Sequence, residues 1–502
     1  MKETEIQFNP NKLIRFLNKP SEEFTKDDIM KFIIENNIEM INFRYAGGDG
    51  KLKTLNFVIT SKSHLESILT TGERVDGSSL FSFIEAGSSD LYVIPRFETA
   101  YLNPFAQVPT VDIFCSFFNS NGQPLASSPE NILVKANKFF TEKTGYKFKA
   151  LAELEYYVIS DINSLYPTSD QKGYHDSHPF TKWEPLRIEA MRLIAQCGGK
   201  IKYSHSEVGC FNTENQYFEQ HEIEFLPTSV IEAADMVMLS KWILRMLGDK
   251  YGVTITFAPK ISVGKAGNGM HIHMLLEKEG KNVMSENGKL SNIAKQMIAG
   301  ILDVAGALTA FGNTVPTSYL RLVPHQEAPT TVCWGDRNRS VLVRVPLGWL
   351  QNADGMISIA NPQQPKLAST PNSKQTVEFR APDGSADIYM LLAGLVVAAQ
   401  HGLEMENSLQ LAEMLYVDYN IHAEENKAKV IDFASLPESC WESAEMLNDN
   451  IFLFEKNNVF PRGTIMEVIK KLKSYHDVDL SERLYGKNNE IKTLVDRYLH
   501  TR

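Results

Sequence analysis

The segment from Lys149 to Val158 constrains the fold of this chain more than any other. It reads Lys-Ala-Leu-Ala-Glu-Leu-Glu-Tyr-Tyr-Val, an apolar strand pattern that contains two carboxylates. Alternation along a strand sends the side chains of Glu153 and Glu155 to the same face of a sheet. An isolated pair of this kind more often lies on a solvated face, but two neighbouring anions on an apolar strand repel each other unless a cation joins them. The segment therefore predicts a sheet with a candidate cation site on one face.

Three more glutamates and a histidine pair strengthen this interpretation. Glu207, Glu222 and Glu378 each lie in a short strand-like run, where burial of an unpaired charge would be costly. Hard oxygen ligands suit Mg²⁺ or Mn²⁺ rather than zinc. His271 and His273 lie two residues apart on a predicted strand, so both imidazoles share one face. Such a pair is more often structural, but the glycine-rich loop before it permits close approach of the backbone to a ligand and favours a binding site.

Arginines are dense in the second half of the chain. Arg321, Arg339, Arg344 and Arg380 lie beside apolar residues such as those at 341–343, which argues against simple solvated ion pairs. Guanidinium groups suit the planar recognition of carboxylate and phosphate oxygens. The chain has no Gly-x-x-x-x-Gly-Lys-[Ser/Thr] loop, so a P-loop nucleotide site is excluded. An enzyme that handles phosphate here must hold its nucleotide with metals and arginines.

Composition limits the partners and the compartment. The chain of 502 residues is 43% hydrophobic and has a formal net charge of −10, which excludes intrinsic disorder and makes nucleic acid an unlikely partner. Its five cysteines are scattered and form no Cys-x-x-Cys pair, as expected in a reducing cytosol. The N-terminus lacks the apolar core of a signal peptide, and the most apolar stretch, Ile388 to Ala399, is too short to span a bilayer. We expect a cytoplasmic protein with no membrane partner.

The periodicity of apolar residues predicts an α+β architecture. The first ~115 residues of the chain alternate a helix with strands, and the rest of the chain mixes strands with long helices. Thr25 is the predicted cap of the first helix. Helices are expected at 21–36, 183–198, 228–251, 291–311, 386–405 and 463–475, and strands at 40–45, 53–59, 90–94, 110–114 and 149–158.

An ordered series of motifs resembles the glutamine synthetases, the glutamate–ammonia ligases, in their bacterial type I form. A single one of these motifs would be weak, but their order along nearly the whole chain is specific. The series comprises Val75-Asp-Gly-Ser-Ser79, Glu153-Leu-Glu155, Phe257-Ala-Pro-Lys-Ile261 before the glycine-rich loop and His271, Arg321-Leu-Val-Pro324 with Glu327-Ala-Pro329, Arg337-Asn-Arg-Ser340 and Glu378-Phe-Arg380.

The resemblance implies a fold, an activity and an assembly. The fold would be a small N-terminal β-grasp domain within residues 1–120 and a large catalytic α/β domain with an antiparallel sheet over residues 121–502. The activity would be the ATP-dependent ligation of ammonia to L-glutamate through a γ-glutamyl phosphate, with two or three Mg²⁺ or Mn²⁺ ions per site. The assembly would be a homo-oligomer, a dodecamer of two hexameric rings, with active sites shared between subunits.

The resemblance also implies residue roles. Asp76, Glu327 and Arg339 would be catalytic, and His273, Arg339 and Arg344 would bind the nucleotide. The metals would be held by Glu155, Glu207 and Glu222 at one position and by Glu153, His271 and Glu378 at the other. Glutamate and ammonium would be bound by Ser79, Tyr174, Glu207, Gly267, His271, Arg321 and Arg380.

Two alternatives stay open at the level of sequence. Ala266 stands where the family usually has an asparagine that contacts the amino-acid substrate, and residues 208–221 form a longer step than usual between two metal ligands. Both features would fit a γ-glutamyl ligase that acts on another amine, such as a polyamine or ethanolamine. A non-catalytic homologue is the other alternative, although all six candidate metal ligands are present.

Overall fold

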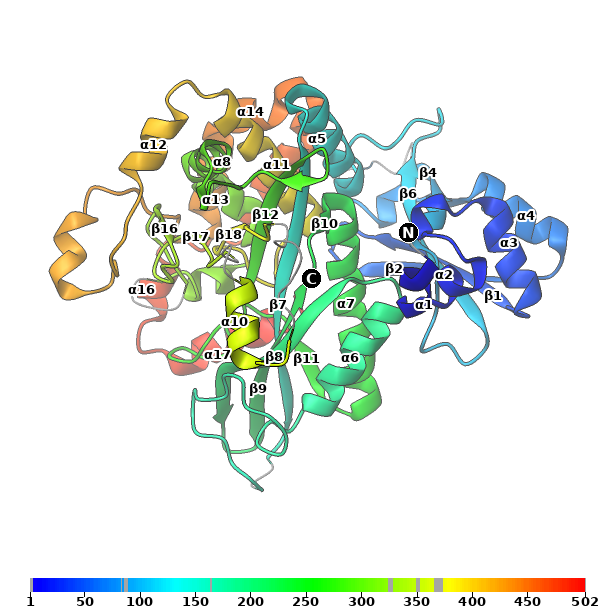
Figure 1. Ribbon diagram of the computed structural model, residues 1–502, viewed down its shortest axis with the longest axis horizontal. Helices are drawn as coiled ribbons and strands as arrows, with labels where there is room; N and C mark the ends of the chain where they lie inside the picture. The colour runs from blue at the N-terminus through cyan, green and yellow to red at the C-terminus, as the bar shows by residue number, and fades with distance from the viewer. Residues whose placement is uncertain are drawn as a thin grey trace.

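The computed structural model describes residues 3–82, 84, 89–162, 165–323, 328–348, 353–364 and 373–501. Two β-sheets organise these residues (Figure 1). A six-stranded sheet belongs to the N-terminal domain, which lies to one side of the molecule, and a ten-stranded sheet runs through the larger remainder. Each sheet has a hydrophobic core cluster of its own. The predicted α+β class, with a small N-terminal domain and a large second domain, is confirmed.

The N-terminal sheet has the strand order β2-β1-β6-β4-β3, with β5 paired to β6. The pair β1–β6 is parallel, and the other pairs are antiparallel. Thr25 caps α3 in a full capping box with Asp28, as the sequence predicts, although the helix begins at Lys26 and a separate 3₁₀ turn precedes it. The elements are α1 (Glu3–Phe8), α2 (Lys12–Leu17), η1 (Ser21–Glu23), α3 (Lys26–Glu35), β1 (Met40–Ala46), β2 (Leu52–Val58), α4 (Lys62–Thr71), β3 (Glu73–Asp76), η2 (Gly77–Ser79), β4 (Asp90–Pro95), η4 (Phe97–Thr99), β5 (Tyr101–Leu102) and β6 (Thr110–Phe118).

The large sheet has the strand order β16-β17-β18-β12-β7-β9-β8. All described pairs in it are antiparallel except β16–β17. Strands β10 and β11 extend the sheet along β7, and β13 pairs with β12. The strands are β7 (Lys147–Asp161), β8 (Ile201–Asn212), β9 (Gln216–Phe225), β10 (Thr228–Ser229), β11 (Thr254–Thr256), β12 (Met270–Lys278), β13 (Lys281–Asn282), β16 (Trp334–Asp336), β17 (Val343–Val345) and β18 (Val377–Phe379), with a separate hairpin of β14 (Ser285–Glu286) and β15 (Lys289–Leu290).

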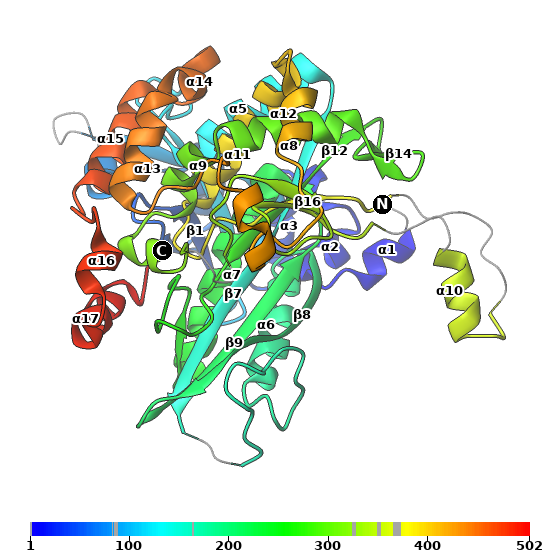
Figure 2. The ribbon, with the colours of Figure 1, turned by 90° about the vertical axis from the view of Figure 1, so that its left-hand side faces the viewer.

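Helices cover this sheet and leave the acidic face for the site. Helices α5 and α7 pack against β7, and α6 packs against β8. Helix α10 stands away from the body of the molecule (Figure 2). The helices are α5 (Pro129–Thr144), α6 (Glu184–Gln196), α7 (Val230–Tyr251), α8 (Asn292–Asp303), α9 (Ala305–Gly312), η5 (Pro316–Leu320), α10 (Ala353–Ala360), α11 (Ile388–Glu404), α12 (Ser408–Met414), η6 (Glu424–Lys429), α13 (Cys440–Asp449), α14 (Ile451–Glu455), η7 (Lys456–Asn458), α15 (Arg462–Lys473), α16 (Leu480–Leu484) and α17 (Asn488–Tyr498).

The helix predicted at 291–311 is wrong as one element. It is divided at Val304, where φ is −118° and ψ is 19°, into α8 and α9, which meet at an angle of 74°. Both halves are apolar and mostly buried, so the hydrophobic pattern runs through the break without a signal.

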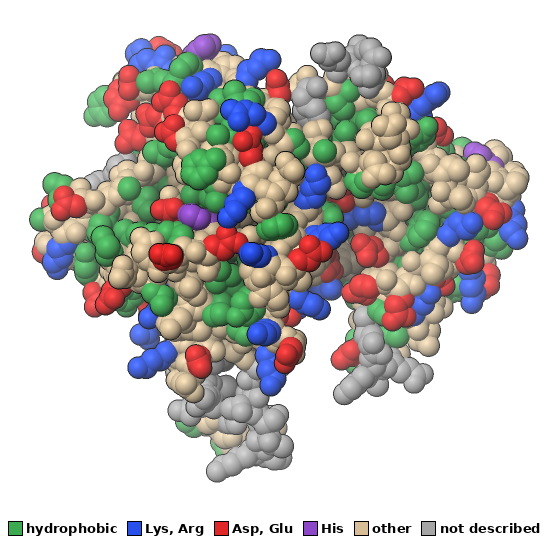
Figure 3. Space-filling model, turned by 90° about the horizontal axis from the view of Figure 1, so that it is seen from above, with side chains coloured by type: hydrophobic (Ala, Val, Ile, Leu, Met, Phe, Trp, Pro, Cys, Tyr) green, Lys and Arg blue, Asp and Glu red, His purple; other side chains and the backbone are tan. Residues whose placement is uncertain are grey.

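Two surface properties complete the description. In the described part of the chain, no single helix has the length and apolar character needed to cross a membrane. Two bent helix pairs have that length and apolar character only when their two helices are taken together. The face seen in Figure 3 has acidic and basic side chains interspersed rather than one continuous basic surface.

Candidate active site

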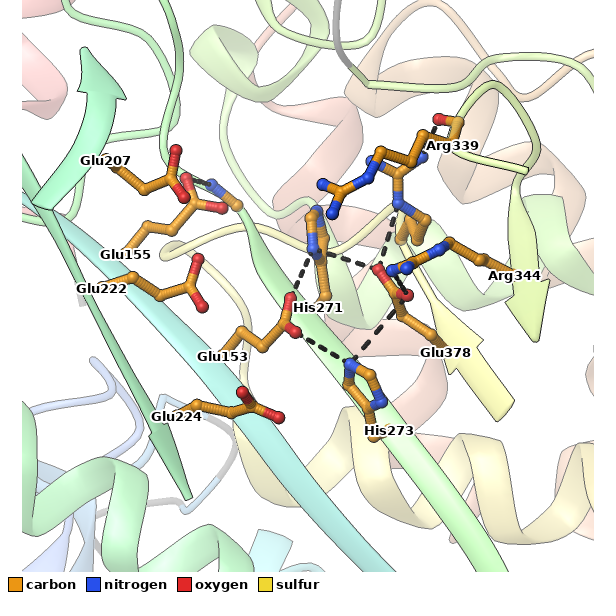
Figure 4. Close-up of polar contacts among 12 residues, drawn as sticks. Glu153, Glu155, Glu207, Glu222, Glu224, His271, His273, Arg339, Arg344 and Glu378 are labelled. Carbon is orange, nitrogen blue, oxygen red and sulfur yellow. Dashed lines mark hydrogen bonds and ion pairs between the residues drawn. The ribbon is translucent and has the colours of Figure 1, made fainter. Parts of the chain in front are cut away.

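The register of four neighbouring strands gathers charged side chains on one face of the large sheet. His271 on β12 lies opposite Glu153 on β7, and His273 lies opposite Glu378 on β18. On the other side of β7, Glu155 lies opposite Glu222 on β9. Figure 4 shows these side chains directed into one region from strands that are distant in sequence.

The first group is centred on Glu153. Its carboxylate is 2.8 Å from His271 Nδ1 and 2.9 Å from His273 Nε2. Glu378 Oε1 lies 3.4 Å from His271 Nδ1, and donor atoms of Glu153, His271 and Glu378 lie within 4.8 Å of one another. Burial by itself would raise the pKa of Glu153, but the two imidazoles outweigh burial and hold that pKa well below its usual value. This group therefore has the ligands and the charge to bind a divalent cation.

The second group contains Glu207 and Glu222. Their carboxylates lie within 4.8 Å of each other and of a ring nitrogen of His205. Glu207 occupies a β-bulge, because residues 207–209 of β8 face a single residue of β9 between the pairs Ser206–His221 and Cys210–Glu219. Because His205 pairs with Glu222 just before the bulge, alternation along β8 puts Glu207 on the same acidic face, and the irregular pairing begins at that residue.

The residues after this bulge extend the β8–β9 hairpin rather than form a separate loop, because β8 continues to Asn212. Glu155 completes the acidic face beside the second group, and its Oε2 accepts hydrogen bonds from Gly269 N at 2.8 Å and Gln220 Nε2 at 3.0 Å. These bonds fix the orientation of the carboxylate.

Electrostatics indicates that a cation completes this face. Burial raises the pKa of Glu222 well above its usual value, and the carboxylates of Glu153, Glu155, Glu207 and Glu224 raise it further. So many buried acids in one place are unfavourable without a compensating positive charge. Carboxylate oxygens with one or two imidazoles fit Mg²⁺ or Mn²⁺, the ions that the sequence suggests. The residues present therefore fit the predicted metals.

Arginines border the first group. Arg344 donates to Glu378 Oε2 at 2.7 Å, and Arg380 Nε donates to Glu378 Oε1 at 3.1 Å. Arg321 donates from NH1 to the backbone oxygen of Ala381 at 2.8 Å, and its NH2 is 3.5 Å from His271 Nε2. Arg339 is exposed, and Figure 4 shows its side chain extending toward the cluster. The arginines therefore place positive charge beside the acidic face, where they could contact an anionic substrate bound against that face.

The glycine-rich loop before β12 approaches the site closely. A Cβ atom on Gly269 would lie 2.8 Å from Arg321 NH2 and 2.9 Å from His271 Nε2. A Cβ atom on Gly267 would lie 2.4 Å from the backbone oxygen of Pro259. Both positions therefore require glycine, because any larger residue would displace the site or the loop.

Ala266 is held in this loop through its backbone. Its oxygen accepts from the Tyr157 hydroxyl at 2.8 Å, and its N–H donates to Gln171 Oε1 at 2.7 Å. Asn268 is fully buried and donates to the backbone oxygen of Ala258 at 2.9 Å. The loop is thus fixed by contacts that do not depend on the side chain at 266.

The remaining site residues predicted from the sequence are Tyr174, Asp76, Ser79 and Glu327. Tyr174 is 48% exposed, stacks on His175 at 4.2 Å and contacts His205 edge-on at 5.4 Å, which places it beside the second group. Asp76 ends β3 in the N-terminal domain and accepts from Ser79 Oγ at 2.7 Å. In the ranges given above, Asp76 and Ser79 make no hydrogen bond or ion pair with the large sheet. Glu327 lies outside the described residues.

The hydroxyl of Ser79 and those of neighbouring serines donate hydrogen bonds to Asp76 and hold the pKa of its carboxyl well below the usual value. The carboxylate is therefore ionised at neutral pH.

Sequence reasoning missed His205, Glu224 and Thr376. His205 groups with the second pair of acids, and Glu224 groups with Glu153 and His273. Thr376 Oγ1 lies 2.9 Å from His273 Nδ1 and orients that ring. The spacing of two residues between His205 and Glu207, and between Glu222 and Glu224, was the available signal, because it puts each pair on one strand face.

Comparison with known proteins gives a consistent result. A family model described as the glutamine synthetase β-grasp domain matches residues 37–120, and one described as the glutamine synthetase catalytic domain matches residues 126–482. Glutamine synthetase of Clostridium saccharobutylicum is 31% identical over 439 residues, which cover 85% of this chain and 90% of that protein. Glutamine synthetase of Pyrococcus furiosus is 33% identical over 387 residues, which cover 77% of this chain and 80% of that protein.

Solved structures share the fold at lower identity. The cryo-EM structure of Plasmodium falciparum glutamine synthetase has a TM-score of 0.72 and 20% identity, and covers 93% of this chain and 97% of that one. A structure of GmaS with ADP has a TM-score of 0.70 and 18% identity, and covers 90% of this chain and 96% of that one. These likenesses concern the fold.

Proposed function

The chain belongs to the glutamine synthetase family, and from this premise we propose that it is a glutamate–ammonia ligase, which forms L-glutamine from L-glutamate and ammonia at the expense of ATP. The observation that carries the proposal is the acidic face of the large sheet, where six carboxylates and three histidines from strands β7, β8, β9, β12 and β18 converge beside arginines. A carboxylate is a poor acyl donor, so the reaction must first convert the γ-carboxylate of glutamate to a γ-glutamyl phosphate.

Two Mg²⁺ or Mn²⁺ ions fit this face in our proposal. Glu153, His271 and Glu378 would hold one, and Glu155, Glu207 and Glu222 the other, with His205 and Glu224 next to them. When bound, the ions supply positive charge that offsets the charge of phosphate and carboxylate oxygens. The close approach of the Glu207 and Glu222 carboxylates supports this assignment, because without a cation the two negative charges would repel each other.

The arginines would position the anionic substrates. Arg339 and Arg344 would contact the phosphoryl group in transfer, and His273 would lie near the nucleotide. Arg321 and Arg380 would bind the carboxylates of glutamate. The pairing of Arg344 and Arg380 with Glu378 supports these roles, because it preorganises two guanidinium groups where charge develops.

The acceptor must lose a proton before it attacks. Ammonium has no lone pair, and a carboxylate such as Asp76 would take its proton. Glu207 and Tyr174 would border the ammonium position, and Glu327 would keep water away from the acyl phosphate. The low pKa of Asp76 keeps its carboxylate ionised, which supports the attraction of ammonium to this residue, while its affinity for the proton would have to rise in the assembled site.

We propose a homo-oligomer, two stacked rings of six subunits, in which Asp76 and Ser79 complete a site of a neighbouring subunit. Both residues belong to the N-terminal domain, and among the described residues they make no hydrogen bond with the acidic face of their own chain, which supports this arrangement. We also propose a cytoplasmic location, supported by the five cysteines, all of which are buried free thiols.

A glutamine assay with ammonium, ATP and Mg²⁺ tests the proposed activity. We expect glutamine and ADP in equal amounts, and Arg344→Gln should lower kcat/KM by at least about 100-fold because a charge-stabilising donor is lost. Arg192→Gln removes the same charge from the surface of α6, where the side chain is 60% exposed, and should leave activity unchanged. Absence of glutamine at saturating ammonium, or full activity of Arg344→Gln, would refute the proposal.

Hybrid oligomers test the sharing of sites. Asp76→Asn and Glu378→Gln subunits should each be inactive alone. If each site takes Asp76 from a neighbour, co-expression of the two variants should restore about a quarter of the wild-type activity by random pairing. If both residues act within one chain, the hybrid would stay inactive.

A further inference from the structure

A cavity between the two domains lies away from the acidic face. Its volume is about 330 Å³, within the range of small-molecule sites, and its walls come from three separate segments. The turn before β2 contributes Lys51, helix α7 contributes Lys241, Trp242 and Arg245, and the last turn of the described chain contributes His500. Figure 1 shows β2 beside α7 at the junction of the two domains, with the end of the chain nearby.

The walls are basic in a protein that is acidic overall. They carry two lysines, an arginine and a histidine, and none of the described residues that line them is an Asp or a Glu. The whole chain, by contrast, has 51 Lys and Arg against 61 Asp and Glu. A concave surface with charges of one sign concentrates counter-ions, so the cavity favours an anion.

The cationic groups are fixed in position by the fold. Lys241 is only 4% exposed and donates to the backbone oxygen of Gly384 at 2.7 Å. Arg245 donates from NH2 to the backbone oxygen of Thr501 at 3.0 Å. Both groups also lie over the ring of Phe257, at 5.4 and 5.1 Å from its centre. Preorganised cations of this kind bind an oxyanion with little loss of side-chain freedom.

Two further features support an anion site. Burial lowers the pKa of Arg245, and an anion beside its guanidinium would favour the charged form. Trp242 is held by Arg44, whose guanidinium lies 4.5 Å from the ring centre and whose Nε donates to Asp112 at 2.6 Å. The aromatic wall is therefore rigid.

We propose that this cavity is a binding site for a small molecule with at least two negative charges, carried by phosphate or carboxylate groups, and that the site is separate from the active site. Lys51, Lys241 and Arg245 contact the anionic groups, and Trp242 contacts the remainder of the ligand. Because the ligand touches the N-terminal turn and α7 together, its binding stabilises the docking of the two domains.

Calorimetric titration of the full-length, metal-free protein tests the proposal, with sodium phosphate and sodium citrate as probes in separate arms. We expect saturable binding of at least one probe, with a dose-dependent rise in Tm. Lys51 is exposed in a turn, so Lys51→Gln should fold normally and weaken binding by about fivefold, while Arg245→Gln should weaken it by more than about tenfold. Binding of phosphate alone would identify phosphate esters as the ligand class, and binding of citrate alone would identify polycarboxylates.

Two matched variants test whether the probe binds in this cavity rather than elsewhere on the protein. Lys53→Gln removes the same charge two residues along β2, but Lys53 pairs with Asp49 at 2.6 Å and does not line the cavity, so binding should be unchanged. Arg344→Gln alters the active site and should also leave binding unchanged. Absence of saturable binding, equal weakening in Lys51→Gln and Lys53→Gln, or loss of binding in Arg344→Gln alone would overturn the proposal.

Discussion

Replacement of Glu222 by glutamine should have opposite effects on the protein with and without divalent metal. Burial raises the pKa of Glu222 well above its usual value, and four neighbouring carboxylates raise it further. Glutamine keeps the size and the hydrogen-bonding capacity of the side chain but removes one negative charge. Without metal, the substitution relieves repulsion and should stabilise the fold; with metal, it removes a ligand and should weaken binding.

The size of the first effect follows from the geometry. Carboxylate oxygens of Glu207 and Glu222 lie within 4.8 Å of each other. Two full charges at that distance repel by about 3.5 kcal/mol at an effective dielectric constant of about 20. Because the raised pKa means that the acids are partly protonated, we expect a gain of about 1–2 kcal/mol in the free energy of unfolding. For a chain of this length, that gain corresponds to a rise of about 1–2 °C in Tm.

Thermal denaturation in EDTA and in excess Mg²⁺ measures both effects. At about 100 times its Kd, the metal should stabilise the wild-type protein by about 2.7 kcal/mol, or about 3 °C, and Glu222→Gln by less than about 1 °C. Glu214→Gln, an exposed change in the turn of the same β8–β9 hairpin, is the matched control and should behave as the wild type. A lower Tm of Glu222→Gln in EDTA, or an undiminished gain with Mg²⁺, would refute the electrostatic reasoning.

Three other changes test the site and the fold. Gly269→Ala should lower kcat/KM by at least about 100-fold, because the new Cβ displaces side chains of the site. Its Tm should change by less than about 2 °C, because the backbone is not displaced. Gly463→Ala, where a Cβ meets nothing within 4 Å, is the control and should change neither quantity in the same assays. Ser79→Ala should raise the pKa of Asp76 toward its usual value, which is still far below neutral, so the carboxylate stays ionised. The pH profile of kcat/KM between about pH 6 and pH 9 should therefore not move, and a shifted acid limb would contradict this reasoning. Asp112→Ala should lower the unfolding free energy by about 3–5 kcal/mol in thermal denaturation, because it strips a buried guanidinium of its partner; a loss below about 1 kcal/mol would contradict the buried-pair argument.

Properties that depend on a single strand could be predicted from the sequence. Alternation alone indicates that Glu153 and Glu155 share a face, as do His271 and His273, and in the structure both imidazoles contact Glu153. The capping of α3 by Thr25 is likewise a local property, set by the backbone N–H groups of one turn. Local sterics and hydrogen bonding decide such features, so a single segment is sufficient to reveal them.

Properties that depend on distant packing could not be predicted. The bulge at residues 207–209 depends on three residues of β8 facing one residue of β9, and neither strand reveals that mismatch by itself. The break at Val304 lies in a continuous apolar pattern with no proline. Both halves pack on α11, but α8 also packs on α12 and α9 on α13, which a local pattern does not reveal. His205 was missed because a lone histidine beside a serine is more often simply polar than a ligand.

The same distinction bears on the arrangement of the catalytic residues. The acidic face is assembled within one chain, but Asp76 lies at the end of β3, in the other sheet, where its described partners are serines of its own turn. The hydroxyls that hold its pKa low also prevent it from acting as a base toward weak acids, so it can accept a proton only from a strong donor or beside concentrated negative charge. The acidic face supplies such a field, because it keeps Glu222 protonated more readily than an ordinary glutamate. In the proposed oligomer, Asp76 would lie against the acidic face of a second copy, and the negative charge of that face would raise the affinity of its carboxylate for a proton.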